Sequence, residues 1–258
     1  MISEYLLTLL VILIAFTLLF GLAQYLKNNS VIDTFWGISF IIAAITALVI
    51  SLDFSSPQIV VTILVFIWGS RLSTRIYLRN KGKAEDWRYA AWRIKWGDNV
   101  LFRSYTDVFL VQAIFCFLVS IPVIYINLNN LRIAYPVILI IGILLWIFGF
   151  LFETIGDNQL DEFKKSKPKK ESVLNTGLWQ YTRHPNYFGE ATQWWAIGII
   201  VLSTGFSAWW TLIGPITITY LLLKVSGIPM LEKKMSKNPK YKSYMAKTNK
   251  FLPGPVKN

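Results

Sequence analysis

The chain has 258 residues, of which 54% are hydrophobic, and its mean hydropathy is +0.47. These values exclude an ordinary soluble domain and place the chain among membrane proteins. The formal net charge of +12 does not indicate nucleic-acid binding, because the basic residues alternate with long apolar runs.

Apolar runs of about 20 residues predict transmembrane helices. The first run follows an acidic residue and lacks a small-residue cleavage site, so we interpret it as a retained helix rather than a signal peptide. The single cysteine, Cys116, lies inside another run, so no intrachain disulfide can form. Seven spans are predicted, near residues 5–25, 31–52, 58–79, 104–126, 134–155, 187–204 and 208–229.

The charge pattern predicts how these spans are oriented. Lys and Arg gather in residues 71–103, 164–170 and 233–257, whereas the connections near residues 53–57, 126–132 and 204–207 hold only Arg132. By the positive-inside rule, the basic segments are cytoplasmic. We therefore expect an all-α polytopic membrane protein forming one domain over residues 1–258, with the N-terminus outside and the C-terminus in the cytoplasm. The last two spans, joined at Thr204–Ser207, are expected to form an antiparallel hairpin.

Several ionisable or amide side chains lie within or beside the predicted spans. Such groups are costly at membrane depth unless they have partners or face a wet cavity. They either pair with one another as structural contacts or line one polar cavity on the cytoplasmic side. The set comprises Asp33, Arg71, Asp107, Gln112, Glu153, Asp157, Glu190 and Lys224.

A lysine-rich stretch follows the fifth span, at residues 156–170. If the helix continues past the membrane, Asp157, Leu160 and Lys164 share one face. The lysines can bind anionic lipid headgroups or the phosphates of a soluble cofactor. Both interpretations remain open from the residues alone.

The segment "TGLWQYTRHPNYFGE", residues 176–190, contains the only histidine. Pro185 suits the first turn of a helix, and Arg183, His184 and Asn186 place donors around the helix N-terminus, which favours anions. Glu190 lies one turn beyond Asn186. The segment is either an anion site or simply a helix start. One histidine and one cysteine exclude the familiar zinc ligand sets.

This segment, with "VIDTFWG", "GKAEDWRY" and "YKSYMAKTNKFLPGP", resembles the bacterial DUF1295 group within the steroid 5-alpha-reductase superfamily. The resemblance covers most of the chain and is strongest from Gly156 onward, so the cofactor half is expected within 156–258. It implies a seven-helix reductase of the bacterial inner membrane that takes NADPH from the cytoplasm. Its substrate would be a hydrophobic molecule with a carbon-carbon double bond conjugated to a ketone, such as a 3-oxo-4-ene steroid.

The resemblance also assigns roles to residues. Asn186 and Glu190 match the motif that faces the nicotinamide, and Tyr187 joins them. Phosphate contacts fall to Lys83, Lys164, Arg183 and His184. The remaining cofactor positions implied by matched motifs are Asn80, Asp157 and Tyr244.

The proton donor is less directly implied, because no tyrosine occurs around Trp68–Arg71. Tyr89, or a protonated acid such as Asp33 or Glu190, is assigned to polarise the developing enolate, since apolar surroundings favour a neutral carboxyl group. We expect a monomer in the lipid bilayer with no nucleic-acid partner and no metal. Two alternatives remain: an S-adenosylmethionine-dependent lipid or isoprenylcysteine methyltransferase using Glu232, and a non-enzymatic transporter.

Overall fold

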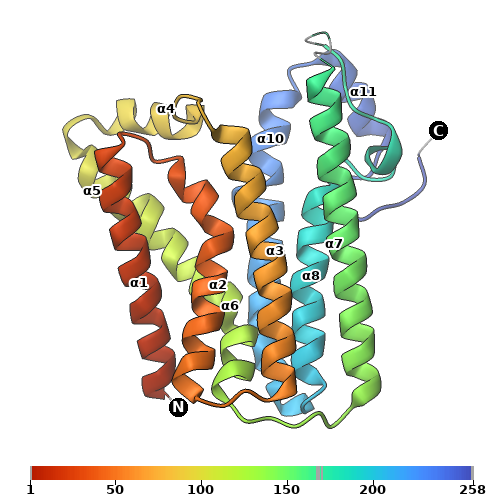
Figure 1. The fold of residues 1–258 in the computed structure, drawn as a ribbon. Coiled ribbons are helices and arrows are strands. Elements are labelled where there is room, and N and C mark those ends of the chain that lie inside the picture. The colour runs from red at the N-terminus through yellow and green to blue at the C-terminus, as the bar shows by residue number, and fades with distance from the viewer. Residues whose placement is uncertain (1, 167–168, 170, 257–258) are drawn as a thin grey trace. The chain divides into compact units, whose positions relative to one another are not determined.

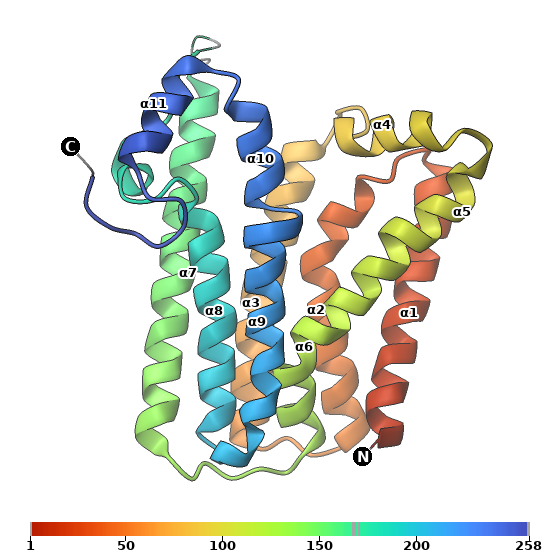
Figure 2. The ribbon, with the colours of Figure 1, turned by 180° about the vertical axis from the view of Figure 1, so that it is seen from behind.

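The computed structural model describes residues 2–166, 169 and 171–256. The predicted all-α class is confirmed, because no strand occurs among these residues and their regular elements are helices. The internal contacts divide the chain into two compact units, residues 1–134 and 135–258. Figures 1 and 2 together label the helices of both units.

The first unit is built around α2, which packs against α1, α3 and α6. The closest approach joins α2 to α3, where a Cβ atom added to Gly37 would lie 2.4 Å from the carbonyl oxygen of Gly69. Neither position therefore tolerates a side chain without moving a helix. The bounds are Ile2–Tyr25 for α1, Val31–Ser51 for α2, Ser56–Asn80 for α3 and Val111–Leu128 for α6.

A shorter helix, α4 (Trp87–Trp96), follows α3 and begins where the Asp86 carboxylate accepts a hydrogen bond from the backbone N–H of Arg88. Gly97, with φ of +50°, ends it in a left-handed conformation that favours glycine. The chain then continues through α5 (Val100–Ser104) and the π-helical turn Tyr105–Leu110 into α6 (Figure 2). The apolar pattern had predicted one helix from residue 104 and neither α4 nor the π-helical turn.

The second unit is organised by α7 (Pro136–Lys165) and α8 (Pro185–Leu202), which lie side by side and antiparallel (Figures 1 and 2). Gly142, Gly149 and Gly156 recur every seven residues on α7, and each directs its missing side chain at α8. From α8, a Cβ atom on Gly189 would lie 2.5 Å from the backbone nitrogen of Glu153. The two backbones are thus in contact along a glycine seam, as at membrane helix interfaces.

The remaining helices of the second unit complete its other side. Beyond the turn at Ser203–Gly205, the next segment packs back on α8, as predicted for a hairpin. The expected extension of the fifth span is also present, since α7 continues to Lys165. The bounds are Ile213–Tyr220 for α9, Leu221–Val225 for a second π-helical turn, Ile228–Met235 for α10 and Pro239–Lys247 for α11.

Six helices among the described residues are long and apolar enough to cross a membrane, which makes the chain an integral membrane protein. The helix α8 is not among the six, because polar side chains interrupt its first half. The six are Ile2–Tyr25, Val31–Ser51, Ser56–Asn80, Trp87–Leu128, Pro136–Lys165 and Phe206–Met235.

Candidate functional site

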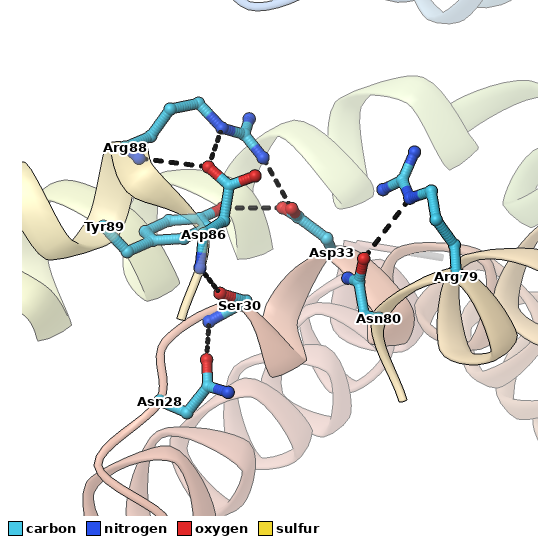
Figure 3. A network of polar contacts seen from close by, with 8 residues as sticks. All are labelled: Asn28, Ser30, Asp33, Arg79, Asn80, Asp86, Arg88 and Tyr89. Carbon is cyan, nitrogen blue, oxygen red and sulfur yellow. Dashed lines mark hydrogen bonds and ion pairs between the residues drawn. The ribbon is translucent and has the colours of Figure 1, made fainter. Parts of the chain in front are cut away.

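In the first unit, the structure joins two of the predicted catalytic residues. The Tyr89 hydroxyl donates a hydrogen bond to Oδ1 of Asp33 at 2.6 Å, and Arg88 donates to Oδ2 of the same carboxylate at 2.6 Å (Figure 3). Asp33 lies in the first turn of α2, where the helix dipole also favours a negative charge. Tyr89 is 3% exposed. Asp33 is therefore held as an anion between two donors from α4.

The Arg88 side chain is fixed in turn by Asp86, whose Oδ1 accepts from Nε at 2.8 Å. Burial opposes ionisation of Asp86, but the hydrogen bonds from Arg88 outweigh it and hold the pKa of Asp86 below its usual range. The backbone N–H of Asp86 donates to the Ser30 hydroxyl, and Asn28 accepts from the backbone of Ser30 (Figure 3). This chain of contacts ties the start of α4 to the connection between α1 and α2.

Two further predicted residues lie near the start of the connection between α3 and α4. The Asn80 side-chain oxygen accepts a hydrogen bond from Nε of Arg79 at 3.3 Å (Figure 3). Lys83 is exposed. Their predicted contacts with a cofactor phosphate stay predictions.

In the second unit, a buried charge cluster stands at the start of α8. Arg183, 7% exposed, donates through Nε to Oε1 of Glu232 at 2.8 Å. His184 Nε2 lies 3.1 Å from the same oxygen, and its ring stacks on Tyr187 at 5.7 Å between centroids. The side chains of Arg183 and His184 thus both contact the Glu232 carboxylate of α10.

The same arginine holds the segment after α11. Its Nη1 donates to the carbonyl oxygens of Met245 and Thr248 at 3.0 and 2.6 Å, and its backbone N–H donates to Asn249. With Glu232, these contacts engage all three guanidinium nitrogens. Further hydrogen bonds join Thr182 to Phe251, Gly254 to Tyr181 and the Tyr244 hydroxyl to the carbonyl of Trp179. We call residues 244–254 the C-terminal strap.

Burial of His184 disfavours the imidazolium ion and lowers its pKa, although Glu232 partly opposes this shift. A depressed histidine pKa means that the unfolded chain binds the proton more readily, so stability is complete above the usual histidine pKa of 6.5 and falls as pH drops below it. We expect the melting temperature in detergent to decrease between about pH 7 and about pH 5. A thermal melt series checks this, and His184→Gln should flatten the slope, because the chain has no second histidine. An equal slope in the variant would assign the effect to other groups.

Along α8, three polar residues follow one another at helical spacing. Asn186, Glu190 and Gln193 are separated by four and three residues and therefore form one stripe. Glu190 is 7% exposed and Gln193 is 1% exposed. The side-chain oxygens of Asn186 and Gln193 are buried without a hydrogen-bond partner. This polar stripe is unusual within an otherwise apolar helix.

The two predicted positions on α7, Asp157 and Lys164, differ in their exposure to solvent. Asp157 is buried, 2% exposed, on the face of α7 that carries Gly149, Glu153 and Gly156, whereas Lys164 is exposed two turns later. Asp157 and Lys164 lie on one face of α7, as predicted, but this face is buried at Asp157 and exposed at Lys164. The lysines at 167 and 170 lie outside the described residues.

The structure also reveals polar partners to which the sequence analysis gave no site role. Arg88 stands directly before Tyr89 in "WRY", yet nothing in the pattern links it to Asp33, which is 55 residues away. Gln193 follows Glu190 by three residues, so its place on the same helical face was the available signal. Glu232 was considered only for the methyltransferase alternative, and its pairing with Arg183 could not be deduced from spacing.

Comparison with known proteins places most of the chain in one family. Residues 19–248 match the family described as a protein of unknown function (DUF1295). An uncharacterized protein of Schizosaccharomyces pombe is 26% identical over 271 residues, covering 91% of this chain and 75% of its own length. No solved structure matches the chain.

Proposed function

The chain belongs to the DUF1295 family, and on this basis we propose that it is an NADPH-dependent membrane reductase of the steroid 5-alpha-reductase type. The reaction is the reduction of the carbon-carbon double bond of a conjugated enone in a lipid-like molecule, with a 3-oxo-4-ene steroid as the leading substrate. NADPH supplies the hydride when it is bound. The protein has to hold the enone against it and stabilise the charge that develops on the ketone oxygen.

The observation that carries this proposal is the polar stripe of α8, in which Glu190 and Gln193 are buried and Asn186 is half-buried. An apolar helix that holds Asn186, Glu190 and Gln193 within two turns of its N-terminus has a polar face suited to a polar ligand. The backbone N–H groups at the N-terminus of α8 are further donors, and the helix dipole there favours phosphate. The "RHPNYFGE" resemblance assigns this helix to the nicotinamide end of the cofactor.

We further propose that α8 is the seventh span, with the six apolar helices as the other six. The N-terminus is then outside and the basic segments face the cytoplasm of a bacterial inner membrane. Buried polar groups in a span are expected where a ligand or cavity adjoins it. This explains why α8 falls below the hydropathy of an ordinary span.

The contacts refine the roles within this proposal. We assign Arg183 to positioning the C-terminal strap rather than to phosphate, because protein acceptors already occupy its three nitrogens. The exposed Lys83 and Lys164 remain the phosphate candidates. His184 is buried and its Nε2 faces Glu232, so we assign it with Arg183 rather than to phosphate. Tyr244 belongs with Arg183, since its hydroxyl is bonded to the backbone.

For the developing enolate, we assign Tyr89 as the hydrogen-bond donor and Asp33 as its orienting partner. Asp33 accepts from both Tyr89 and Arg88, which is the arrangement of a carboxylate and not of a neutral acid. The single hydroxyl proton of Tyr89 is donated to Asp33 in this structure, so it has to turn from Asp33 to a stronger acceptor in order to polarise the ketone. A ketone oxygen that gains charge during hydride transfer is such an acceptor.

A ligand-binding experiment tests the proposed function against its rivals. In detergent, NADPH should raise the melting temperature of the purified protein more than NADH does, because a ligand that binds only the folded state stabilises it. A response to S-adenosylmethionine alone would favour the methyltransferase, and a response to none of the three would remove the support for a cofactor enzyme.

Replacing Tyr89 with phenylalanine tests the catalytic assignment. Loss of one donor to a developing oxyanion lowers kcat by about 100-fold, so Tyr89→Phe should oxidise NADPH slowly with a 3-oxo-4-ene steroid while its NADPH affinity is unchanged. Tyr105→Phe is the matched control, since that hydroxyl bonds only to Thr17 among the hydrogen bonds of the described residues. Undiminished turnover in Tyr89→Phe would show that another group polarises the ketone.

A further inference from the structure

Gln193 lies two turns into α8 and is almost completely enclosed. Its side chain is 1% exposed, and its neighbours on α7 are Gly149 and Glu153. No role follows for this residue from the family resemblance. A buried amide has two donor hydrogens and one acceptor oxygen to satisfy, so the contacts around it can be assessed atom by atom.

The orientation of this amide is determined by its neighbours. Nε2 of Gln193 lies 2.6 Å from Oε2 of Glu153 and 3.2 Å from the carbonyl oxygen of Gly189. Both partners are acceptors, so only the nitrogen of the amide can face them. An exchange of nitrogen and oxygen would set oxygen against oxygen on both sides. Oε1 is therefore forced to point away from Glu153 and Gly189.

That oxygen has no hydrogen-bond partner, although it is buried. A buried acceptor without a donor is costly, and such groups are rare in folded proteins. The Asn186 oxygen, on the same stripe of α8, is buried without a partner too. Because seven residues of helix span about 10 Å, the backbone positions of the two residues are separated by roughly the length of a ring with its attached sugar.

We propose that Oε1 of Gln193 accepts a hydrogen bond from the primary carboxamide of the nicotinamide ring. This inference rests on the proposed function and makes Gln193 a specificity residue for the reacting end of the cofactor. The amide nitrogen of the ligand is the donor, and Glu153 fixes the acceptor in place through Nε2. The stripe then runs from Asn186 on the sugar side to Gln193 at the carboxamide.

The test uses a cofactor that differs in this one group. The 3-acetylpyridine analogue of NADP⁺ carries a methyl ketone in place of the carboxamide, so it lacks the N–H donor. In the wild-type protein, NADP⁺ should bind about tenfold more tightly than the analogue, as expected when one buried acceptor is left unpaired. In Gln193→Met, whose thioether is only a weak acceptor, the two ligands should bind within about twofold of each other.

The ratio of the two affinities is taken within each protein, so a general loss of stability in Gln193→Met cancels. Thr192→Val is the matched control, because the Thr192 hydroxyl bonds to the carbonyl of Phe188 in its own helix. It should keep the wild-type ratio. If the wild-type protein binds both ligands equally, the inference is overturned while the proposed function stands. If neither ligand binds, both are overturned.

Discussion

Gly189→Val is expected to abolish accumulation of folded protein. A Cβ atom at this position would lie 2.5 Å from the backbone nitrogen of Glu153 and 2.6 Å from the carbonyl oxygen of Gly149. Both obstacles are backbone atoms, so α7 and α8 must separate to admit a side chain. Separation removes the contact that organises the second unit and leaves buried Glu153 and Gln193 without each other. Size-exclusion chromatography of detergent-solubilised protein measures the remaining folded fraction.

Gly21→Val is the matched control, because a Cβ atom on Gly21 meets nothing within 4 Å. It lies in α1, also inside an apolar helix, so the chemical change and the setting are the same. This variant should elute like the wild-type protein. Normal folding of Gly189→Val would contradict the glycine seam, and so would equal loss in both variants.

Arg183→Met should lower the free energy of unfolding by about 3–5 kcal/mol, the range for removing one partner of a buried ion pair. The change leaves the Glu232 carboxylate facing His184 alone and removes the donors to the carbonyls of Met245 and Thr248. The measurement is the melting temperature in detergent. Limited proteolysis should cut Arg183→Met first within the C-terminal strap, because that segment loses its anchor.

The control for this variant is Lys240→Met. Lys240 pairs with Glu171 at 4.0 Å, but both side chains are about two thirds exposed or more, and such surface pairs contribute little to stability. Its melting temperature should match the wild type. A similar small effect of Arg183→Met would show that the strap is held by its backbone hydrogen bonds alone.

The long apolar runs were enough to predict α1, α2, α3 and α7, since twenty consecutive apolar residues have few other structures available. The π-helical turn Tyr105–Leu110 was not predictable, because one extra residue in a turn leaves the composition unchanged. Nor was α4, whose aromatic and basic residues alternate without a long apolar stretch. In the structure α4 has a local cap at Asp86, and Arg88 and Tyr89 bond to Asp33 from α2.

For the candidate site, contacts between residues close in sequence could be predicted from their spacing, whereas contacts between distant residues could not. Asn186 and Glu190 could be placed on one face because they are four residues apart on a predicted helix. The hydrogen bond between Asp33 and Tyr89 crosses 56 residues, and only the motif resemblance had selected both. The residues that fix them, Arg88 and Asp86, lie in the quoted stretch "GKAEDWRY", but its spacing does not indicate that Arg88 contacts Asp33.

The C-terminal strap has a consequence for biosynthesis. Arg183, the Thr182 hydroxyl and the Tyr181 carbonyl have hydrogen-bond partners in residues 245–254, more than 60 positions later in the chain. While the ribosome is still making those residues, a buried arginine at the start of α8 has no carbonyl acceptors. The hydrogen bonds at the N-terminal end of α8 are therefore completed last during synthesis. A nascent protein that stops before residue 245 should be degraded by membrane proteases.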